Sequence, residues 1–133
     1  MAIKIDHIGF TVSSLENALN FCCDLFGVKS EEVKIDTITE RKVRVAVIPV
    51  DGGMIELMES TSPDGWIAKY INEHGEGLHH LALEVSDIRA VLDTLRERGV
   101  PLIDPEPRLG RNGSMIAFLN PESPNVLIEL VEY

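Results

Sequence analysis

The sequence predicts an α+β fold of two tandem βαβββ modules, whose strands form a curved mixed sheet. The prediction rests on an internal repeat, found by setting His7 against His80. This alignment places "HIGFTV" over "HLALEV", each followed by a capping segment, an amphipathic helix and a matching last strand. The chain has 133 residues, enough to bury the core of a single domain. We therefore expect one domain over residues 1–133.

The first module is predicted over residues 1–62. Its first strand is "DHIGFTV", and "SSLEN" has the residues of a helix N-terminus. The helix "LENALNFCCDLFGV" ends at Gly27, a residue suited to a left-handed cap. "RKVRVAVIPV" then predicts a strand that turns at residues 51–53, "DGG", and "MIELMES" predicts the closing strand.

A linker carrying a short helix is predicted over residues 63–77, and the second module over residues 78–133. The strand "GLHHLALEV" leads into "SDIRA" and the helix "IRAVLDTLRERGV", which we expect Gly99 to cap. "SMIAFLNPESPNVLIELVEY" predicts two strands joined around residues 120–125. The modules thus carry the same elements in the same order.

Four polar residues occupy equivalent positions in these apolar strands: His7, Glu56, His80 and Glu129. The separation from histidine to glutamate is 49 residues in both modules. Because strand side chains alternate between faces, each glutamate lies opposite the apolar residues beside it. A carboxylate on the inner face of a sheet is costly unless it is paired or bound to a metal.

Taken singly, a strand histidine is usually a hydrogen-bonded core residue, and a strand glutamate usually faces solvent. Two histidines and two glutamates at equivalent positions of a repeat favour a site for a divalent transition metal. Open positions on the ion would make it catalytic. His79 falls opposite Asp6 in the repeat, on the other face of its strand, and is not expected to be a ligand.

Composition excludes several classes of protein. The formal net charge of −10 argues against nucleic-acid binding, and no apolar run is long enough to span a bilayer. The start of the chain does not read as a signal peptide, which predicts a cytoplasmic protein. Cys22 and Cys23 are adjacent on a predicted helix and point about 100° apart, so we expect reduced thiols.

The chain resembles the vicinal oxygen chelate (glyoxalase/bleomycin resistance/dioxygenase) superfamily, and within it the methylmalonyl-CoA epimerases. The segments that match are "DHIGFTV", "IELMES", "GEGLHHLALEV", "GVPLIDPEPRLGRNGSMIAFLNP" and "VLIELVEY", which together cover most of the chain. The resemblance implies paired βαβββ modules around one metal, a homodimer, and an acyl-CoA substrate whose epimers are interconverted by proton transfer.

Individual roles follow from the resemblance. His7, Glu56, His80 and Glu129 would bind a divalent ion, with Co²⁺, Mn²⁺, Ni²⁺ and Zn²⁺ all open. Glu129 and Glu40 would exchange the substrate proton, and Glu56 could replace either. Arg41, Lys42, Arg44, Arg108 and Arg111 are available for the CoA moiety, without any one being assigned to it.

The sequence departs from the epimerase pattern in two places. Arg41-Lys42 replaces the usual Gln-Gly after Glu40, so a different local turn is expected. Asn120 and Glu122 stand where the epimerases usually have His and Lys. An acid in place of that lysine could indicate a different thioester or no CoA.

Three other functions share the fold. A glyoxalase I-like lactoylglutathione lyase would use the same metal ligands, but "NPESPN" replaces its usual "DPDG"-type loop. An extradiol dioxygenase needs two histidines and one carboxylate, so a fourth ligand argues against it. A metal-free small-molecule binding protein would not need the ligand set. Because one fold hosts many functions, the site has to discriminate among them.

Overall fold

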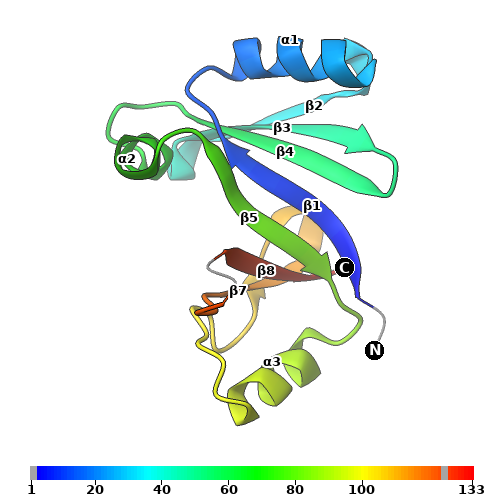
Figure 1. Ribbon diagram of the computed structural model, residues 1–133, viewed down its shortest axis with the longest axis vertical. Coiled ribbons are helices and arrows are strands. Elements are labelled where there is room, and N and C mark those ends of the chain that lie inside the picture. The colour runs from blue at the N-terminus through cyan, green and yellow to red at the C-terminus, as the bar shows by residue number, and fades with distance from the viewer. Residues whose placement is uncertain (1–2, 124–125) are drawn as a thin grey trace. The chain divides into compact units, whose positions relative to one another are not determined.

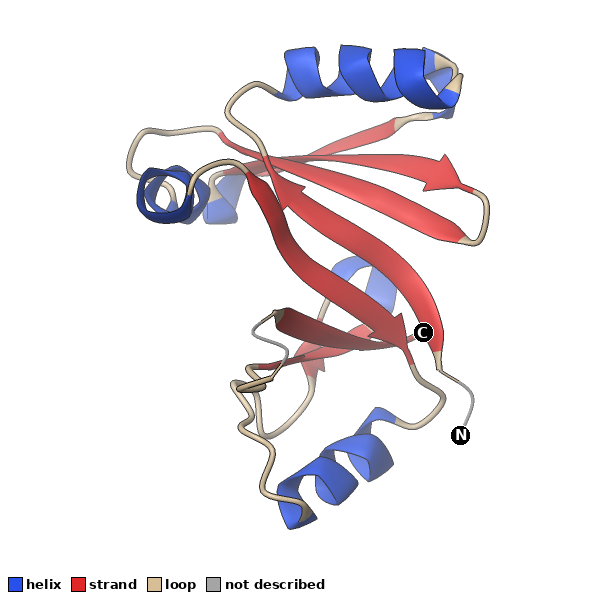
Figure 2. Ribbon diagram, viewed as in Figure 1, coloured by secondary structure: helices blue, strands red, loops and turns tan. Residues whose placement is uncertain are grey.

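The structure is a computed structural model that describes residues 3–123 and 126–133. Its eight strands form one mixed sheet in the order β2-β3-β4-β1-β5-β8-β7-β6, which confirms the predicted α+β class (Figures 1 and 2). Within the described residues no helix is long and apolar enough to cross a membrane. The chain divides into two compact units. Unit 1 joins the chain up to His7 with residues 80–133, and unit 2 is residues 8–79.

The elements alternate along the chain as the repeat predicts. The strands are β1 Lys4–Thr11, β2 Lys34–Ile38, β3 Val43–Val50, β4 Gly53–Ser60, β5 Gly77–Glu84, β6 Arg108–Leu109, β7 Met115–Leu119 and β8 Leu127–Glu132. The α-helices are α1 Leu15–Phe26, α2 Trp66–His74 and α3 Ile88–Glu97. The 3₁₀ turns are η1 Ser30–Glu32, η2 Thr39–Arg41 and η3 Arg111–Gly113.

Unit 2 has a helix on each face of its antiparallel strands. α1 lies along β2, β3 and β4 (Figure 1), and Leu15 packs with Ala46, Ile48 and Leu57. The other face of these strands packs on α2, where Ile67 joins a cluster of Val43, Val45 and Met58. Even and odd residues of β3 therefore enter different cores, as strand alternation requires.

The two faces of the unit 1 strands carry apolar clusters of different size. β5 pairs in parallel with β8, and β7 pairs antiparallel with β8 and with β6. Ile88 and Leu92 of α3 pack with Leu119 and Leu130 on one face. The opposite face carries a smaller apolar cluster of Ala82, Ile116 and Val131, with Phe118 against it.

The predicted turns and caps are confirmed. β3 and β4 pair as a hairpin closed at residues 51–52, with Val50 opposite Gly53. The linker forms α2. Gly27 and Gly99 adopt φ of 67° and 75°, a left-handed conformation that costs glycine least. Pro124 and Asn125, in the predicted connection between β7 and β8, lie outside the described residues.

A contact that the sequence did not predict repeats in both units. The Glu59 carboxylate of β4 accepts a hydrogen bond from the Leu15 N–H at 2.7 Å. The Glu132 carboxylate of β8 accepts one from the Ile88 N–H at 2.9 Å. Both bonds span 44 residues and place an anion at the positive end of a helix. They show that the repeat extends to how each helix is joined to its sheet.

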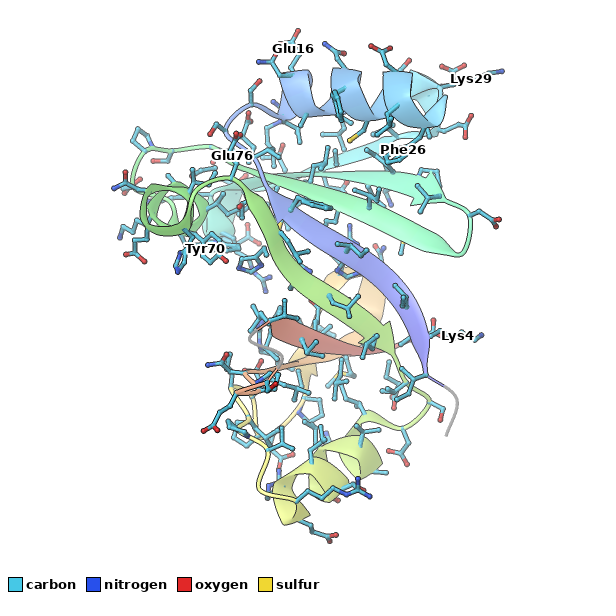
Figure 3. All side chains as sticks on the ribbon, viewed as in Figure 1. Lys4, Glu16, Phe26, Lys29, Tyr70 and Glu76 are labelled. Carbon is cyan, nitrogen blue, oxygen red and sulfur yellow. The ribbon has the colours of Figure 1, made fainter. Side chains whose placement is uncertain are left out.

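Other helix contacts differ in how far they repeat. Ser14 caps α1 by accepting from the Asn17 N–H, and Asp87 caps α3 in the same way. The Ser13 N–H, just before α1, donates to Glu76 Oε1 at 2.6 Å. Glu76 is labelled in Figure 3. The helix starts are thus held both by local caps and by distant carboxylates.

We expect Glu132→Gln to lower the free energy of unfolding by about 1 kcal/mol, and Glu132→Ala by about 2 kcal/mol. The amide keeps an acceptor but loses the charge, whereas alanine also leaves the Ile88 N–H without this acceptor. Urea denaturation measures both. The matched control is Glu97→Gln at the other end of α3, where removing a negative charge should be neutral or slightly stabilising. Equal destabilisation by Glu97→Gln would contradict the capping role.

Candidate metal centre

Two buried histidines face each other in unit 1. His7 on β1 and His80 on β5 are 4% and 3% exposed, and their Nε2 atoms lie 2.9 Å apart. The rings meet edge to face, with centroids 5.0 Å apart and planes at 89°. Residues that are 73 positions apart in the sequence thus point the same ring nitrogen at one place.

Glu129 joins the two histidines from β8. Its Oε1 is 3.7 Å from His7 Nε2, and its Oε2 is 3.8 Å from His80 Nε2. The strand pairing explains this position, because Glu129 sits between Ala82 on β5 and Phe118 on β7. The residue is 7% exposed. The structure therefore brings three of the four predicted ligands together within one unit.

Asp6 and Tyr133 extend this cluster, and sequence reasoning missed both as site residues. Asp6 Oδ2 is 2.7 Å from His7 Nδ1. The Tyr133 hydroxyl donates to both oxygens of the same carboxylate, at 2.8 Å and 2.9 Å. The "DH" pair was visible in the sequence. Strand alternation, however, predicts opposite directions for neighbouring side chains, so the pair gave no sign of a contact.

Electrostatics keep Asp6 ionised and Tyr133 protonated. Burial alone would raise the pKa of Asp6, but hydrogen bonds from His7 and Tyr133 outweigh burial and lower it. Burial, together with the hydrogen bond to Asp6 and its negative charge, raises the pKa of Tyr133. Tyr133 therefore stays protonated and donates to a carboxylate that stays ionised.

The donor set fits a divalent transition metal. When His7 donates its Nδ1 proton to Asp6, its Nε2 carries a lone pair directed toward His80. His7 and His80 direct their Nε2 atoms at one place, 2.9 Å apart, and both would hold an ion through an imidazole nitrogen. Imidazole and carboxylate together suit the ions that the sequence left open.

The Arg108 guanidinium lies over an aromatic ring that itself contacts His80. The Phe118 ring meets the His80 ring edge to face, with centroids 5.9 Å apart. The Arg108 guanidinium carbon is 5.5 Å from the centroid of Phe118, and Arg108 Nε is 3.3 Å from Asp104 Oδ2. Asp104 is itself fixed by the Phe118 N–H, which it accepts at 2.9 Å. Arg108 is thus held between the Phe118 ring and the Asp104 carboxylate, in the same unit as the histidines.

Glu56 belongs to unit 2, on β4 opposite Val47 of β3. It is 8% exposed. Its neighbours Ile55 and Leu57 pack in the cluster under α1, so Glu56 lies on the face away from α1, as alternation predicts. A buried carboxylate among apolar strand residues is consistent with ligation, which remains a prediction for Glu56.

Glu40 is exposed and lies in η2, the turn between β2 and β3 in unit 2. Lys42 closes this turn with φ of 56°. Where the epimerases usually have glycine, this chain thus places lysine in a conformation that glycine favours. Lys42 Nζ also forms an ion pair with Asp64 at 2.7 Å. The catalytic role of Glu40 remains a prediction.

His79 packs against aromatic side chains within unit 2. Its ring lies 5.3 Å from that of Trp66 and 4.7 Å from that of Tyr70, which projects from α2 (Figure 3). Desolvation by this packing, and then the charge of His74, lowers the pKa of His79. These contacts give His79 an aromatic packing role on α2.

Two further features of the sequence concern the segment after β7 and the cysteines. Asn120 and Glu122 are exposed in the segment after β7. Cys22 and Cys23 on α1 are both free thiols. Burial, and secondarily the neighbouring Cys23, raises the pKa of Cys22, so its thiol is less readily converted to the nucleophilic thiolate.

Comparison with known proteins identifies the family. The profile of the Glyoxalase/Bleomycin resistance protein/Dioxygenase superfamily matches residues 6–118, so the chain belongs to this superfamily. An uncharacterized protein of Bacillus subtilis is 35% identical over 130 residues, covering 97% of this chain and 91% of that protein. The mitochondrial methylmalonyl-CoA epimerase of Dictyostelium discoideum is 30% identical over 131 residues, covering 97% of this chain and 78% of that enzyme.

Solved structures agree with the sequence relatives. A methylmalonyl-CoA epimerase in complex with methylmalonyl-CoA and ammonium has a TM-score of 0.82 and 33% identity to this chain, covering 99% of it and 95% of the enzyme. The methylmalonyl-CoA epimerase of Mycobacterium tuberculosis has a TM-score of 0.82 and 34% identity, with 97% and 87% covered. The resemblance to epimerases of this superfamily is thereby confirmed.

Proposed function

We propose that this protein is a metal-dependent methylmalonyl-CoA epimerase. The observation that carries the proposal is the convergence of His7, His80 and Glu129 on one buried place. The similarity to methylmalonyl-CoA epimerases over nearly the whole chain supports the choice of substrate. The acyl-CoA has an acidic proton on the carbon between its thioester and its carboxylate, which suits a buried carboxylate base.

The proposed ligands of the ion are His7, Glu56, His80 and Glu129. A bound divalent ion would supply Lewis acidity toward substrate oxygens and would hold the substrate in one orientation. The protein contributes neutral imidazoles, one of which is oriented by Asp6. Glu56 is supported by its burial and its repeat position.

The proposed proton transfer uses the chain's own carboxylates. One oxygen of Glu129 takes the proton from the substrate carbon, and the C–H electron pair delocalises onto the thioester oxygen. A second acid returns a proton to the opposite face, which inverts the centre. Glu40 is the proposed second group, with Glu56 as the alternative. Ala82, Ile116, Val131 and Phe118 share the Glu129 face of unit 1 and limit water beside this base.

The test is proton exchange on the substrate itself. Purified protein is stripped with a chelator, reloaded separately with Co²⁺, Mn²⁺, Ni²⁺ or Zn²⁺, and mixed with methylmalonyl-CoA in deuterated water. We expect loss of the α-proton NMR signal and racemisation with at least one ion, and neither in the stripped protein. Bound metal without exchange would overturn the substrate assignment. Turnover of a hemithioacetal of glutathione instead would establish a lyase.

We expect Arg108→Gln to raise the KM for methylmalonyl-CoA about tenfold with a smaller change in kcat, because Arg108 lies on the ring that contacts His80 and would bind the anionic substrate without taking part in proton transfer. Initial rates over a range of substrate concentrations measure this. Arg98→Gln is the matched control, at an exposed position after α3. A KM for Arg108→Gln within about twofold of the control would remove Arg108 from substrate binding.

A further inference from the structure

The environment of His7 contains two residues that metal ligation by itself does not require. Asp6 is 8% exposed and Tyr133 lies on the other side of its carboxylate, so the order is phenol, carboxylate, imidazole. The three residues come from the two ends of the chain, and Tyr133 is 127 positions from Asp6. We propose that Asp6 and Tyr133 are positioning residues that hold His7 in the tautomer in which Nδ1 carries the proton and Nε2 has the lone pair that would bind a metal.

The hydrogen bonds define the direction of each proton. A carboxylate only accepts, so the 2.7 Å contact between Asp6 Oδ2 and His7 Nδ1 requires a proton on Nδ1. In the neutral ring, Nε2 is then the acceptor. The Tyr133 hydroxyl reaches both Asp6 oxygens, at 2.8 Å and 2.9 Å, so rotation of the carboxylate away from His7 would break these bonds. The tyrosine thus orients the group that orients the histidine.

The Asp6–Tyr133 pair departs from the internal repeat. The repeat duplicates the metal-site residues, the helix caps and the carboxylates that hold the helix starts. The equivalents of Asp6 and Tyr133 are His79 and Ser60, and they have different contacts. His79 packs on Tyr70, and the Ser60 hydroxyl donates to the Ser62 carbonyl at 2.6 Å. Among the described residues, the positions equivalent to Asp6 and Tyr133 thus carry neither a carboxylate nor a phenol.

The pair also explains how a buried carboxylate is tolerated there. A carboxylate removed from water needs charge-assisted hydrogen bonds, which His7 and Tyr133 supply. Tyr133→Phe deletes one hydroxyl and leaves the ring in place. The whole residue Tyr133 is 65% exposed. Asp6→Asn keeps the size of the side chain but can either accept from or donate to Nδ1, so it no longer selects one tautomer.

This inference rests on the proposed metal site, but its first measurement does not need metal. Proteins with ¹⁵N-labelled histidine are compared in the metal-free state at about pH 8, where imidazoles are largely neutral. Long-range ¹H–¹⁵N spectra report which nitrogen of His7 carries the proton. We expect a single Nδ1-protonated tautomer in the wild type, and a mixture in Asp6→Asn and Tyr133→Phe. Tyr70→Phe, which removes the same hydroxyl in unit 2, should match the wild type.

The second measurement is Zn²⁺ affinity by calorimetry on the same four proteins. We expect the affinity to fall about 10- to 100-fold in Asp6→Asn, less in Tyr133→Phe, and not at all in Tyr70→Phe. An unchanged His7 tautomer in both Asp6→Asn and Tyr133→Phe overturns the positioning role. If the tautomer changes in the variants but the wild-type protein binds no Zn²⁺, the positioning role is supported and the proposed metal site is overturned. The two proposals therefore fail in different ways.

Discussion

Glu129→Gln is expected to reduce the α-proton exchange of methylmalonyl-CoA about a thousandfold. The Glu129 carboxylate lies 3.7 Å and 3.8 Å from the two histidine nitrogens, and in the proposed reaction it is the group that accepts the proton. Glutamine keeps the size of the side chain but has no basic oxygen and no negative charge. Rates of deuterium incorporation, followed by ¹H NMR on protein of measured metal content, give the comparison.

Glu97→Gln is the matched control for this experiment. The chemical change is the same, in the same unit, at an exposed residue at the end of α3. We expect its exchange rate to stay within about twofold of the wild type. Glu129→Gln that binds metal and exchanges at a comparable rate would assign the base to another residue, and Glu40→Gln and Glu56→Gln would then be measured.

Leu92→Ala is expected to have the largest effect on stability, lowering the free energy of unfolding by about 2–5 kcal/mol. Leu92 is 1% exposed and packs from α3 into a cluster with Leu130, the residue after Glu129 on β8. Truncation removes buried apolar surface and leaves a cavity that the surrounding strands fill only partly. Such a loss is a large part of the total stability of a small domain. Urea denaturation followed by circular dichroism gives the value.

Leu25→Ala makes the same chemical change on α1 at a side chain that is 62% exposed. We expect it to cost no more than about 0.5 kcal/mol. A similar loss in both variants would mean that the Leu25 face of α1 is covered in solution, and the stability argument for α3 would have to be revised.

The site could be predicted from the sequence to the extent that the repeat aligned its parts. His7, His80 and Glu129 were found because two copies of one strand pattern carried the same polar residues at one spacing. Asp6 and Tyr133 were not found, because one breaks strand alternation and the other is 127 residues away. Arg108 was one of several available cations until its position over Phe118 distinguished it.

The fold was predictable where local signals are strong. Turn residues, helix caps and strand alternation specified the β3–β4 hairpin, the left-handed glycines and both long helices. The short strands β2 and β6 were not located by the sequence. β6 has only two residues, too few to show a period. β2 follows a 3₁₀ turn and leaves no residue fully buried, so its hydrophobic pattern is weak.

The sequence by itself determined that the protein has two copies of one module and which strand faces carry polar residues. Both follow from periodicity, which the chain specifies over a few neighbouring residues. The tertiary structure alone decided which polar atoms meet. Strand register places Glu129 between Ala82 and Phe118, and the proximity of the two chain ends places Tyr133 on Asp6. Hydrogen bonds and metal ligation act over about 3 Å, a scale that only the assembled sheet fixes.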